Sequence, residues 1–132
     1  MKKPYLISLN RIDEADGSLV AINSGLEIPF EIKRVFYIFN NPREAIRGRH
    51  ANKCTDFVMI PVHGSLKIRL DQVDESWEYQ LHDASKGIFV PMNTWMEVSD
   101  FDGESVLLVL ASTEYEPGQY YENREEYDSI VG

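Results

Sequence analysis

The stretch SLKIRLDQ, Ser65 to Gln72, carries the pattern that decides the fold. Apolar residues at positions 66, 68 and 70 alternate with charged residues at positions 67, 69 and 71. Successive side chains of a β-strand point to opposite faces of the sheet, so this spacing predicts a strand with one buried and one solvated face.

Runs of similar composition flank this stretch on both sides and are separated by turn-forming residues. One of them, FEIKRVFYIFN at 30–40, is rich in β-branched and aromatic residues, as strands are. The others lie at 5–9, 16–22, 47–53, 56–64, 77–81, 86–91, 94–101 and 105–112. Short strands at such regular spacing predict an all-β sandwich or barrel, which we expect to form one domain over residues 1–132. The acidic, tyrosine-rich tail after Glu116 predicts a short helix or turn packed on the outside of the barrel.

Composition narrows the class of protein. The chain has 132 residues, 43% of them hydrophobic, and a formal net charge of −9, which argues against nucleic-acid binding. Cys54 is the only cysteine, so no intrachain disulfide can form, and we expect a cytoplasmic protein. No stretch approaches the roughly 20 apolar residues of a membrane-spanning helix.

The segment IRGRHANKC, 46–54, contains the candidate catalytic residue. Period-two spacing puts His50 and Asn52 on one face of a strand, where metal-binding barrels usually place two histidines. An amide binds metals poorly, and His63 and His82 fall in separate turns, so we predict no metal site. There is no glycine-rich phosphate loop. Cys54 has the alternatives of an activated nucleophile and a small buried thiol, and we expect the latter.

A single histidine with basic neighbours can support proton transfer without a metal or a redox cofactor. A neutral imidazole can take a proton from a carbon beside a ketone, while arginines can hold an anionic group such as a diphosphate. The alternative is structural: His50 can be a hydrogen-bonded strand histidine, and Lys33 and Arg34 can form an ordinary solvated strand edge.

Several ordered stretches resemble one family. IPFEIKRVFYIFN, RGRHANK, GSLKIRL, KGIFVPMNTWMEVSDF and VLLVLASTEYEPGQY follow the order found in the dTDP-sugar 3,4-ketoisomerases, which are cupins of the WxcM-like C-terminal class. The resemblance runs from about Leu9 to Tyr127. It implies a cupin, or jelly-roll, barrel and an isomerase that moves the ketone of dTDP-4-keto-6-deoxyglucose from carbon 4 to carbon 3. Such enzymes need no cofactor, are usually homodimers, and supply 3-amino-3,6-dideoxy sugars for the polysaccharides (lipopolysaccharide, O-antigen) of bacterial surfaces.

The resemblance also implies roles for individual residues. His50 matches the proposed catalytic base, and Arg34 and Arg47 are expected near the diphosphate or the sugar. Trp95 and Glu97 are expected at the pocket wall. The full set of residues expected to bind substrate is Arg34, Phe36, Tyr37, Arg47, Asn52, Lys53, Ser65, Arg69, Trp95 and Glu97.

Two departures from the family pattern bear on the chemistry. Family members usually read HAHK or HSHK where this chain reads HANK, and they often have Tyr-Tyr where this chain has Phe36-Tyr37. We therefore expect His50 to act as the base and Asn52 to hold a ketone or enediolate oxygen. The alternatives are a non-catalytic nucleotide-sugar-binding cupin and a dTDP-sugar epimerase. Both configurations at carbon 4 of the product, and both thymine and uracil as the nucleotide base, remain compatible with the sequence.

Overall fold

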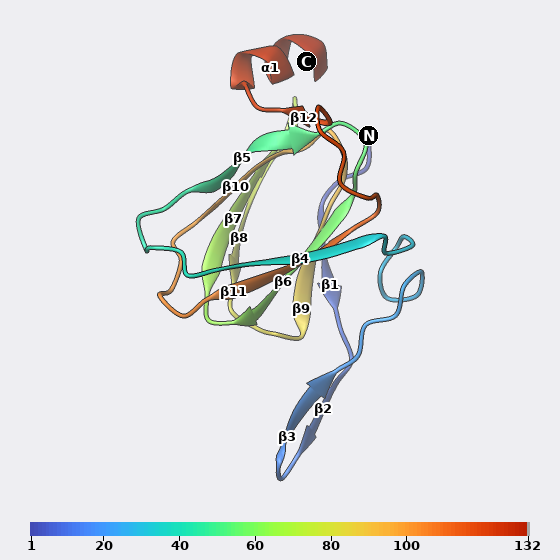
Figure 1. Cartoon of the computed structure of the whole chain (residues 1–132), viewed down its shortest axis with the longest axis vertical. Helices are drawn as coiled ribbons and strands as arrows, with labels where there is room; N and C mark the ends of the chain where they lie inside the picture. The colour runs from blue at the N-terminus through green and yellow to red at the C-terminus, as the bar shows by residue number, and fades with distance from the viewer. Residues whose placement is uncertain (132) are drawn as a thin grey trace.

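The alternating stretch at 65–72 forms strand β7 (Leu66–Asp71), as its pattern predicts. Leu66, Ile68 and Leu70 are at most 1% exposed, whereas Arg69 on the other face is exposed. The computed structural model describes residues 1–131. Strand β7 belongs to one of the two facing sheets that form a barrel (Figure 1).

Eleven further strands and one helix complete the part of the chain that the structure describes. Their bounds are β1 (Tyr5–Ser8), β2 (Arg11–Glu14), β3 (Gly17–Val20), β4 (Arg34–Phe39), β5 (Arg47–Asn52), β6 (Phe57–His63), β8 (Ser76–Leu81), β9 (Lys86–Val90), β10 (Trp95–Ser99), β11 (Val106–Ala111), β12 (Tyr120–Tyr121) and α1 (Arg124–Val131). The predicted all-β class is confirmed, and the tail, for which a short helix or turn was predicted, forms helix α1.

The two sheets are antiparallel, with orders β1-β9-β6-β11-β4 and β12-β5-β10-β7-β8. From β4 to β12 consecutive strands fall in different sheets, with the exception of the hairpin β7–β8, so the chain crosses repeatedly between the layers. This crossing pattern is that of a double-sheet jelly roll. The space between the sheets is filled by apolar side chains that include Met59, Phe101 and Leu107.

The N-terminal part of the chain adds a third layer. Ile28, which is fully buried, packs with Val58, Ile60 and Phe89 on the outer face of the first sheet. Strands β2 and β3 then form a separate hairpin that projects away from the barrel, and helix α1 lies at the opposite end (Figure 1).

Most strands end within one or two residues of the predicted stretches, and larger differences occur at three places. Residues 30–33 were expected to be strand, but regular pairing in this region begins only at Arg34. Strand β2 and the two-residue strand β12 were not predicted, because neither carries an alternating apolar pattern long enough to detect. No helix among the described residues is long and apolar enough to cross a membrane.

Candidate active site

The side chain of His50 lines a cavity of about 160 Å³ between the two sheets. The walls come from β4, β5, β6, β10, β11 and β12. Apart from His50, the lining residues are Phe36, Ile38, Arg47, Gly48, Phe57, Met59, Met96, Val98, Val109 and Tyr120. The cavity is therefore mostly apolar and has very few polar groups, as is usual for a small-molecule site.

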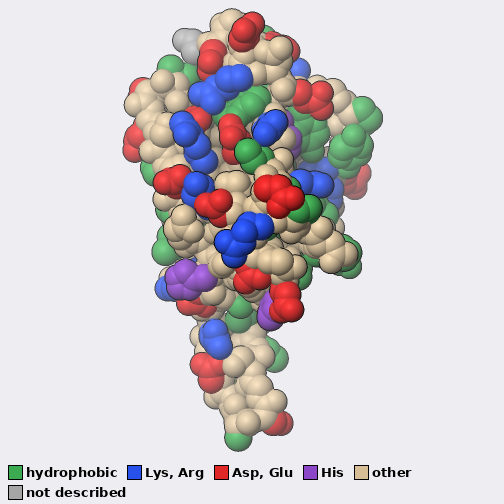
Figure 2. Space-filling model, turned by 90° about the vertical axis from the view of Figure 1, so that its left-hand side faces the viewer, with side chains coloured by type: hydrophobic (Ala, Val, Ile, Leu, Met, Phe, Trp, Pro, Cys, Tyr) green, Lys and Arg blue, Asp and Glu red, His purple; other side chains and the backbone are tan. Residues whose placement is uncertain are grey.

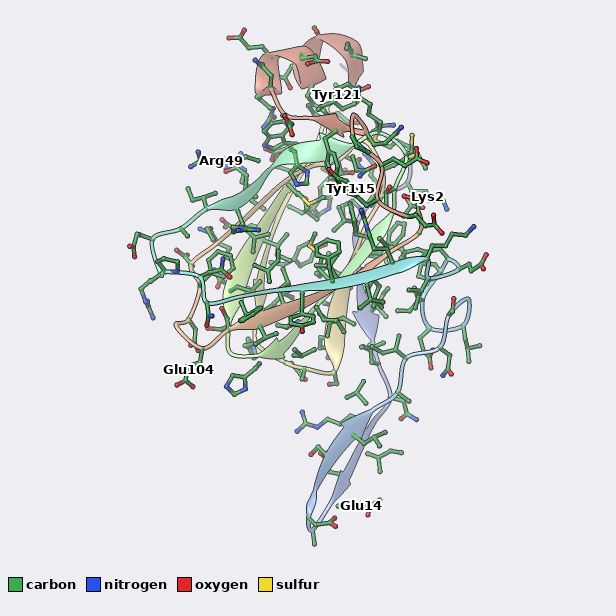
Figure 3. The ribbon with its side chains drawn as sticks, in the orientation of Figure 1. Lys2, Glu14, Arg49, Glu104, Tyr115 and Tyr121 are labelled. Atoms are coloured by element: carbon green, nitrogen blue, oxygen red, sulfur yellow. The ribbon has the colours of Figure 1, made fainter. Side chains whose placement is uncertain are left out.

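A β-bulge in β5 brings Arg47 and His50 to the same cavity. On a regular strand, residues three apart point to opposite faces. Here Met96 pairs with His50 and Val98 pairs with Arg47, so the register shifts by one residue between them. Gly48 and Arg49 adopt positive φ angles of 84° and 57°, and Arg49 is the extra residue. In Figure 3, Arg49 extends away from the barrel at the outer side of β5.

The surroundings of His50 favour its neutral form. Burial lowers the pKa of the imidazole below its ordinary value, and the negative charge of Glu122 opposes this shift in part. The Nδ1 atom is buried and has no hydrogen-bond partner among the described residues. The structural alternative for His50, a hydrogen-bonded strand histidine, therefore finds no support at Nδ1. A neutral imidazole with an unpaired ring nitrogen is suited to accepting a proton.

Arg34 lies beside this cavity and carries an unused donor. Its guanidinium carbon is 5.3 Å from the ring centroid of Phe36 and 5.6 Å from that of Tyr115. Its Nε is buried with no hydrogen-bond partner among residues 1–131. Tyr37 points to the opposite side of β4 and is 61% exposed, as strand alternation predicts. Arg34 is thus held by two aromatic rings while its polar atoms remain available to an anion.

The side chain of Asn52 stabilises the turn after β5 by accepting backbone hydrogen bonds, and it does not line the cavity. It is 2% exposed, and its Oδ1 accepts hydrogen bonds from the backbone N–H groups of Cys54 (2.9 Å) and Thr55 (2.8 Å). Its backbone oxygen accepts a further bond from Asn93 N at 2.7 Å. The geometry thus differs from the expected role of holding a substrate oxygen: the carboxamide is used to end β5 and start the next turn.

Four residues expected at the substrate lie on the outer face of the second sheet. Trp95 is paired with Ala51 and packs against Tyr121 and Tyr127 beneath helix α1. The Trp95 Nε1 donates to Glu97 Oε2 at 3.1 Å. The other two are Arg69, which bonds Asp71 at 3.3 Å, and Lys53, which lies 4.9 Å from the Tyr121 ring centroid. The expectation that Trp95 and Glu97 form the pocket wall is not met, because Met96 and Val98 are the residues of β10 that face inward.

The C-terminal helix is fixed to that outer face by charge and stacking. Arg124 Nη1 donates to Asp71 Oδ2 at 2.9 Å, and its guanidinium carbon lies 5.4 Å from the Trp95 ring centroid. Burial raises the pKa of Asp71, but hydrogen bonds from Ser76 and Arg124 and the charge of Arg69 lower it more, so the net shift is downward. In Figure 3, Tyr121 lies beneath the helix at this end of the barrel.

Two further predictions concern residues outside the cavity. Ser65 lies in the turn between β6 and β7, where its carbonyl accepts from Asp102 N at 2.9 Å, and it does not line the cavity. The expectation of a buried thiol at Cys54 is wrong: the side chain is exposed and its Sγ lies 2.8 Å from Gln119 Oε1.

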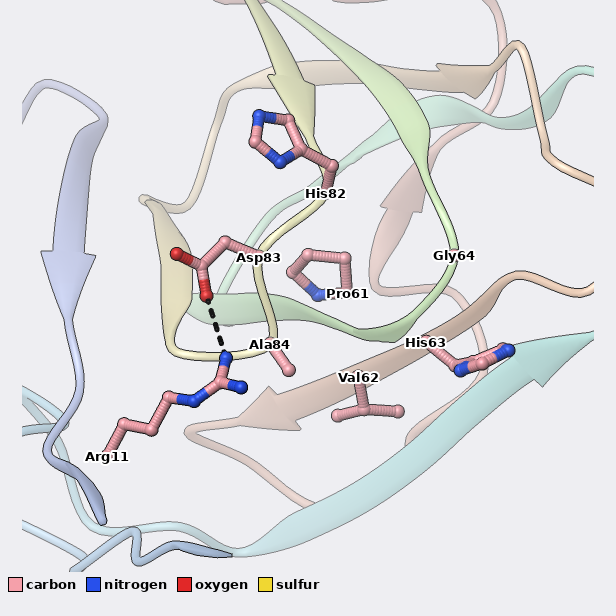
Figure 4. Close-up of a pocket in the computed structure, with 8 residues that line it drawn as sticks. All are labelled: Arg11, Pro61, Val62, His63, Gly64, His82, Asp83 and Ala84. Carbon is pink, nitrogen blue, oxygen red and sulfur yellow. Dashed lines mark ion pairs between the residues drawn. The ribbon is translucent and has the colours of Figure 1, made fainter. Parts of the chain in front are cut away.

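A second concavity, of about 300 Å³, lies where the hairpin meets the barrel (Figure 4). It contains His63 and His82, and an ion pair of 3.8 Å joins Arg11 to Asp83 across it. Both histidines are exposed, and His63 is 3.7 Å from Glu104. Within residues 1–131 there is no group of three or more His, Cys, Asp or Glu side chains placed to hold a metal ion.

Sequence reasoning did not identify Tyr120. Its ring meets that of His50 edge to face, with centroids 4.8 Å apart and an interplanar angle of 75°. The short strand β12 pairs Tyr120 with Asn52 and Tyr121 with Ala51, which turns Tyr120 inward and Tyr121 outward. The only sequence signal was the tyrosine pair itself, which does not indicate which ring faces the cavity.

Comparison with known proteins accounts for this arrangement. Residues 2–132 match the family model described as FdtA: WxcM-like, C-terminal. The chain is 38% identical over 125 residues to TDP-4-oxo-6-deoxy-alpha-D-glucose-3,4-oxoisomerase from Aneurinibacillus thermoaerophilus, covering 92% of this chain and 90% of the relative.

Solved structures agree with the sequence match. A histidine-to-asparagine mutant of the 3,4-ketoisomerase QdtA from Thermoanaerobacterium thermosaccharolyticum, in complex with TDP-4-keto-6-deoxyglucose, has a TM-score of 0.95 at 36% identity, covering 99% of this chain and 95% of that one. The WlaRB TDP-quinovose 3,4-ketoisomerase from Campylobacter jejuni has a TM-score of 0.92 at 35% identity, covering 98% and 99%. The resemblance read from the sequence is confirmed, and the chain belongs to the WxcM-like, C-terminal family of FdtA.

Proposed function

We propose that this chain is a sugar-nucleotide 3,4-ketoisomerase that converts TDP-4-keto-6-deoxyglucose into a TDP-3-keto-6-deoxyhexose. The observation that carries the proposal is the half-buried imidazole of His50, whose Nδ1 has no partner among the described residues, in a small and mostly apolar cavity with Arg34 and Arg47 nearby. Two relatives support the choice of substrate: one is named for TDP-4-oxo-6-deoxy-alpha-D-glucose, at 38% identity, and one was solved in complex with TDP-4-keto-6-deoxyglucose, at 36% identity.

The reaction needs a base that acts on carbon 3. A proton on that carbon is acidified by the neighbouring ketone at carbon 4, and His50 in its neutral form removes it. The electron pair of the C3–H bond becomes the C3=C4 double bond of an enediol. The imidazolium then returns the proton to carbon 4, which leaves the ketone at carbon 3. No net oxidation occurs, so no redox cofactor is required.

The size of the cavity indicates which part of the substrate it encloses and which part stays at its rim. Pockets that enclose whole drug-sized ligands have volumes of about 300–1,000 Å³, whereas this cavity measures about 160 Å³. It therefore suits the deoxysugar ring and leaves the nucleotide at the rim. Arg34, between Phe36 and Tyr115, and the exposed Arg47 are the cations in reach of a diphosphate there.

We further propose that two copies of the chain associate. The hairpin β2–β3 projects from the barrel, as Figures 1 and 2 show. Its paired residues Ile12 and Leu19 are 48% and 57% exposed, which is costly unless another surface covers them. A homodimer supplies that surface, and sedimentation of a Leu19→Lys variant as a monomer would support it. An exposed free thiol at Cys54 suits the reducing cytoplasm, where the product would feed the synthesis of amino sugars for surface polysaccharide.

The proposal is tested by exchanging His50 for asparagine. This variant should bind TDP as the wild type does but lose turnover by about 10²–10⁴-fold, the usual contribution of a general base. The matched control is His63→Asn, because His63 is exposed and lies outside the cavity. Unchanged turnover in the His50 variant would refute the proposed role. TDP binding without turnover in the wild type would favour a nucleotide-sugar-binding protein, and a product still carrying its ketone at carbon 4 would favour an epimerase.

A further inference from the structure

Ketone migration moves two protons, and His50 accounts for one. The carbon-bound proton passes from carbon 3 to carbon 4 through the imidazole. The proton of the 3-hydroxyl must also leave, because that oxygen becomes the new ketone, while the old ketone oxygen at carbon 4 must gain one. A second group that can both donate and accept a proton is therefore needed near the two oxygens.

The lining of the cavity restricts the choice of that group. Among its described lining residues, only Arg47, His50 and Tyr120 have polar side chains, and the others are apolar or glycine. An arginine does not give up its proton in proteins, so Arg47 cannot serve. Phe36 has no hydroxyl, and the carboxamide of Asn52 neither loses nor gains a proton near neutral pH and accepts hydrogen bonds from a turn. Among the described residues that line the cavity, the phenol of Tyr120 remains.

Tyr120 is also held in the right relation to the base. The edge-to-face contact with His50 puts the two rings side by side on one wall. The ring direction is fixed by the β12–β5 pairing, and the adjoining bond from Lys53 N to Gln119 O, at 2.8 Å, extends that pairing. The two oxygens to be served are on adjacent carbons of the sugar, so a single hydroxyl can reach both.

We propose that Tyr120 is a second catalytic residue, which carries the hydroxyl proton from oxygen 3 to oxygen 4. As His50 removes the carbon 3 proton, the phenol donates its proton to oxygen 4 and the enediol forms. As the imidazolium protonates carbon 4, the phenolate takes the proton from oxygen 3, and the O–H bond electrons form the new carbonyl. Both side chains end in their starting states, and every proton is accounted for. This step rests on the proposed function.

The test compares Tyr120→Phe with Tyr121→Phe. Each substitution removes one phenolic oxygen, but Tyr121 faces the helix side of the sheet and packs against Tyr127. The ring of Tyr120 is kept, so the packing against His50 is retained. Steady-state kinetics with TDP-4-keto-6-deoxyglucose, TDP affinity and thermal unfolding would be measured for both variants and the wild type. We expect kcat of Tyr120→Phe to fall by about 10²-fold or more with KM and TDP affinity little changed, and Tyr121→Phe to keep its kcat.

The outcomes separate this proposal from the one on which it rests. A wild type that turns over, with kcat of Tyr120→Phe within threefold of it, would overturn the role of Tyr120 and leave the isomerase assignment intact. If KM of Tyr120→Phe rises and its TDP affinity falls to the same extent as kcat/KM, Tyr120 has a binding role, and the proposed proton transfer is overturned as well. If Tyr120→Phe unfolds, Tyr120→3-fluorotyrosine, which keeps the hydroxyl but makes it more acidic, must shift the pH dependence of kcat; an unchanged profile overturns the proposal. A wild type without turnover refutes the function itself.

Discussion

Gly48→Ala should damage both the stability and the site, because Gly48 forms the bulge that aligns Arg47 with His50. A methyl group at this position would lie 2.9 Å from the carbonyl oxygen of Met96, which is closer than real Cβ contacts allow. The backbone φ of 84° costs a residue with a side chain about 1–2 kcal/mol, and the overlap adds about 1–3 kcal/mol. The free energy of unfolding should therefore fall by roughly 2–5 kcal/mol.

A matched control separates the two contributions. Gly25 has a φ of 72° and no atom within 4 Å of an added methyl group, so Gly25→Ala should lose only the conformational part, about 1–2 kcal/mol. Urea unfolding followed by circular dichroism measures both values, and TDP-sugar turnover measures the site. Gly48→Ala should also lose turnover, since straightening β5 would turn Arg47 away from His50. Equal destabilisation by the two substitutions, with turnover intact in both, would refute the reasoning.

Three other perturbations follow from the site and its supports. Glu122→Gln removes the negative charge that raises the pKa of His50, so the acid limb of the pH profile of kcat/KM should move to lower pH. The control is Glu125→Gln. A move to higher pH, or an equal move in the control, would contradict this. Asn52→Ala leaves two backbone N–H groups without their acceptor and should cost about 1–3 kcal/mol in urea unfolding, whereas Asn52→Asp should keep most of it at neutral pH; equal losses would argue against the turn role. Arg124→Met should lower the free energy of unfolding by about 1 kcal/mol. It should also weaken the loss of stability in acid, because the depressed pKa of Asp71 adds stability that is lost as pH falls through that pKa. An unchanged pH dependence of thermal unfolding would count against the Arg124–Asp71 ion pair.

Strand identity was predictable wherever one face of a strand meets solvent. The alternation at 66–71 is found in β7, and β4 turns Phe36 inward and Tyr37 outward as expected. The facing of β10 was predictable only in part. Met96 and Val98 alternate with Glu97 and Ser99, which marks the first pair as inward. Trp95 lies on the outer face but is buried with Tyr121 and Tyr127 beneath helix α1, so its apolar character alone did not show which side it faces.

The site depends on two features that local sequence does not encode. The bulge at Gly48 and Arg49 exists only in relation to the register of β10, so a regular strand would have put Arg47 and His50 on opposite faces. The inward placement of Tyr120 comes from the two-residue strand β12, which pairs Tyr120 with Asn52, 68 positions earlier in the chain. His50 was singled out from its strand position and basic neighbours, but its role as the base came from the resemblance of RGRHANK to the family, because the residues alone also allowed a structural histidine.

The central claim is tested most directly by following the sugar protons in D₂O. The purified protein would be incubated with TDP-4-keto-6-deoxyglucose and the proton NMR spectrum recorded over time. The account predicts loss of the carbon 3 proton signal and the appearance of a 3-keto sugar, with neither change in the His50→Asn variant. Carbon 4 of the product receives protium by direct transfer through His50, or deuterium where the imidazolium exchanges its proton with D₂O first. A substrate that keeps its carbon 3 proton while TDP binding is intact would contradict the account.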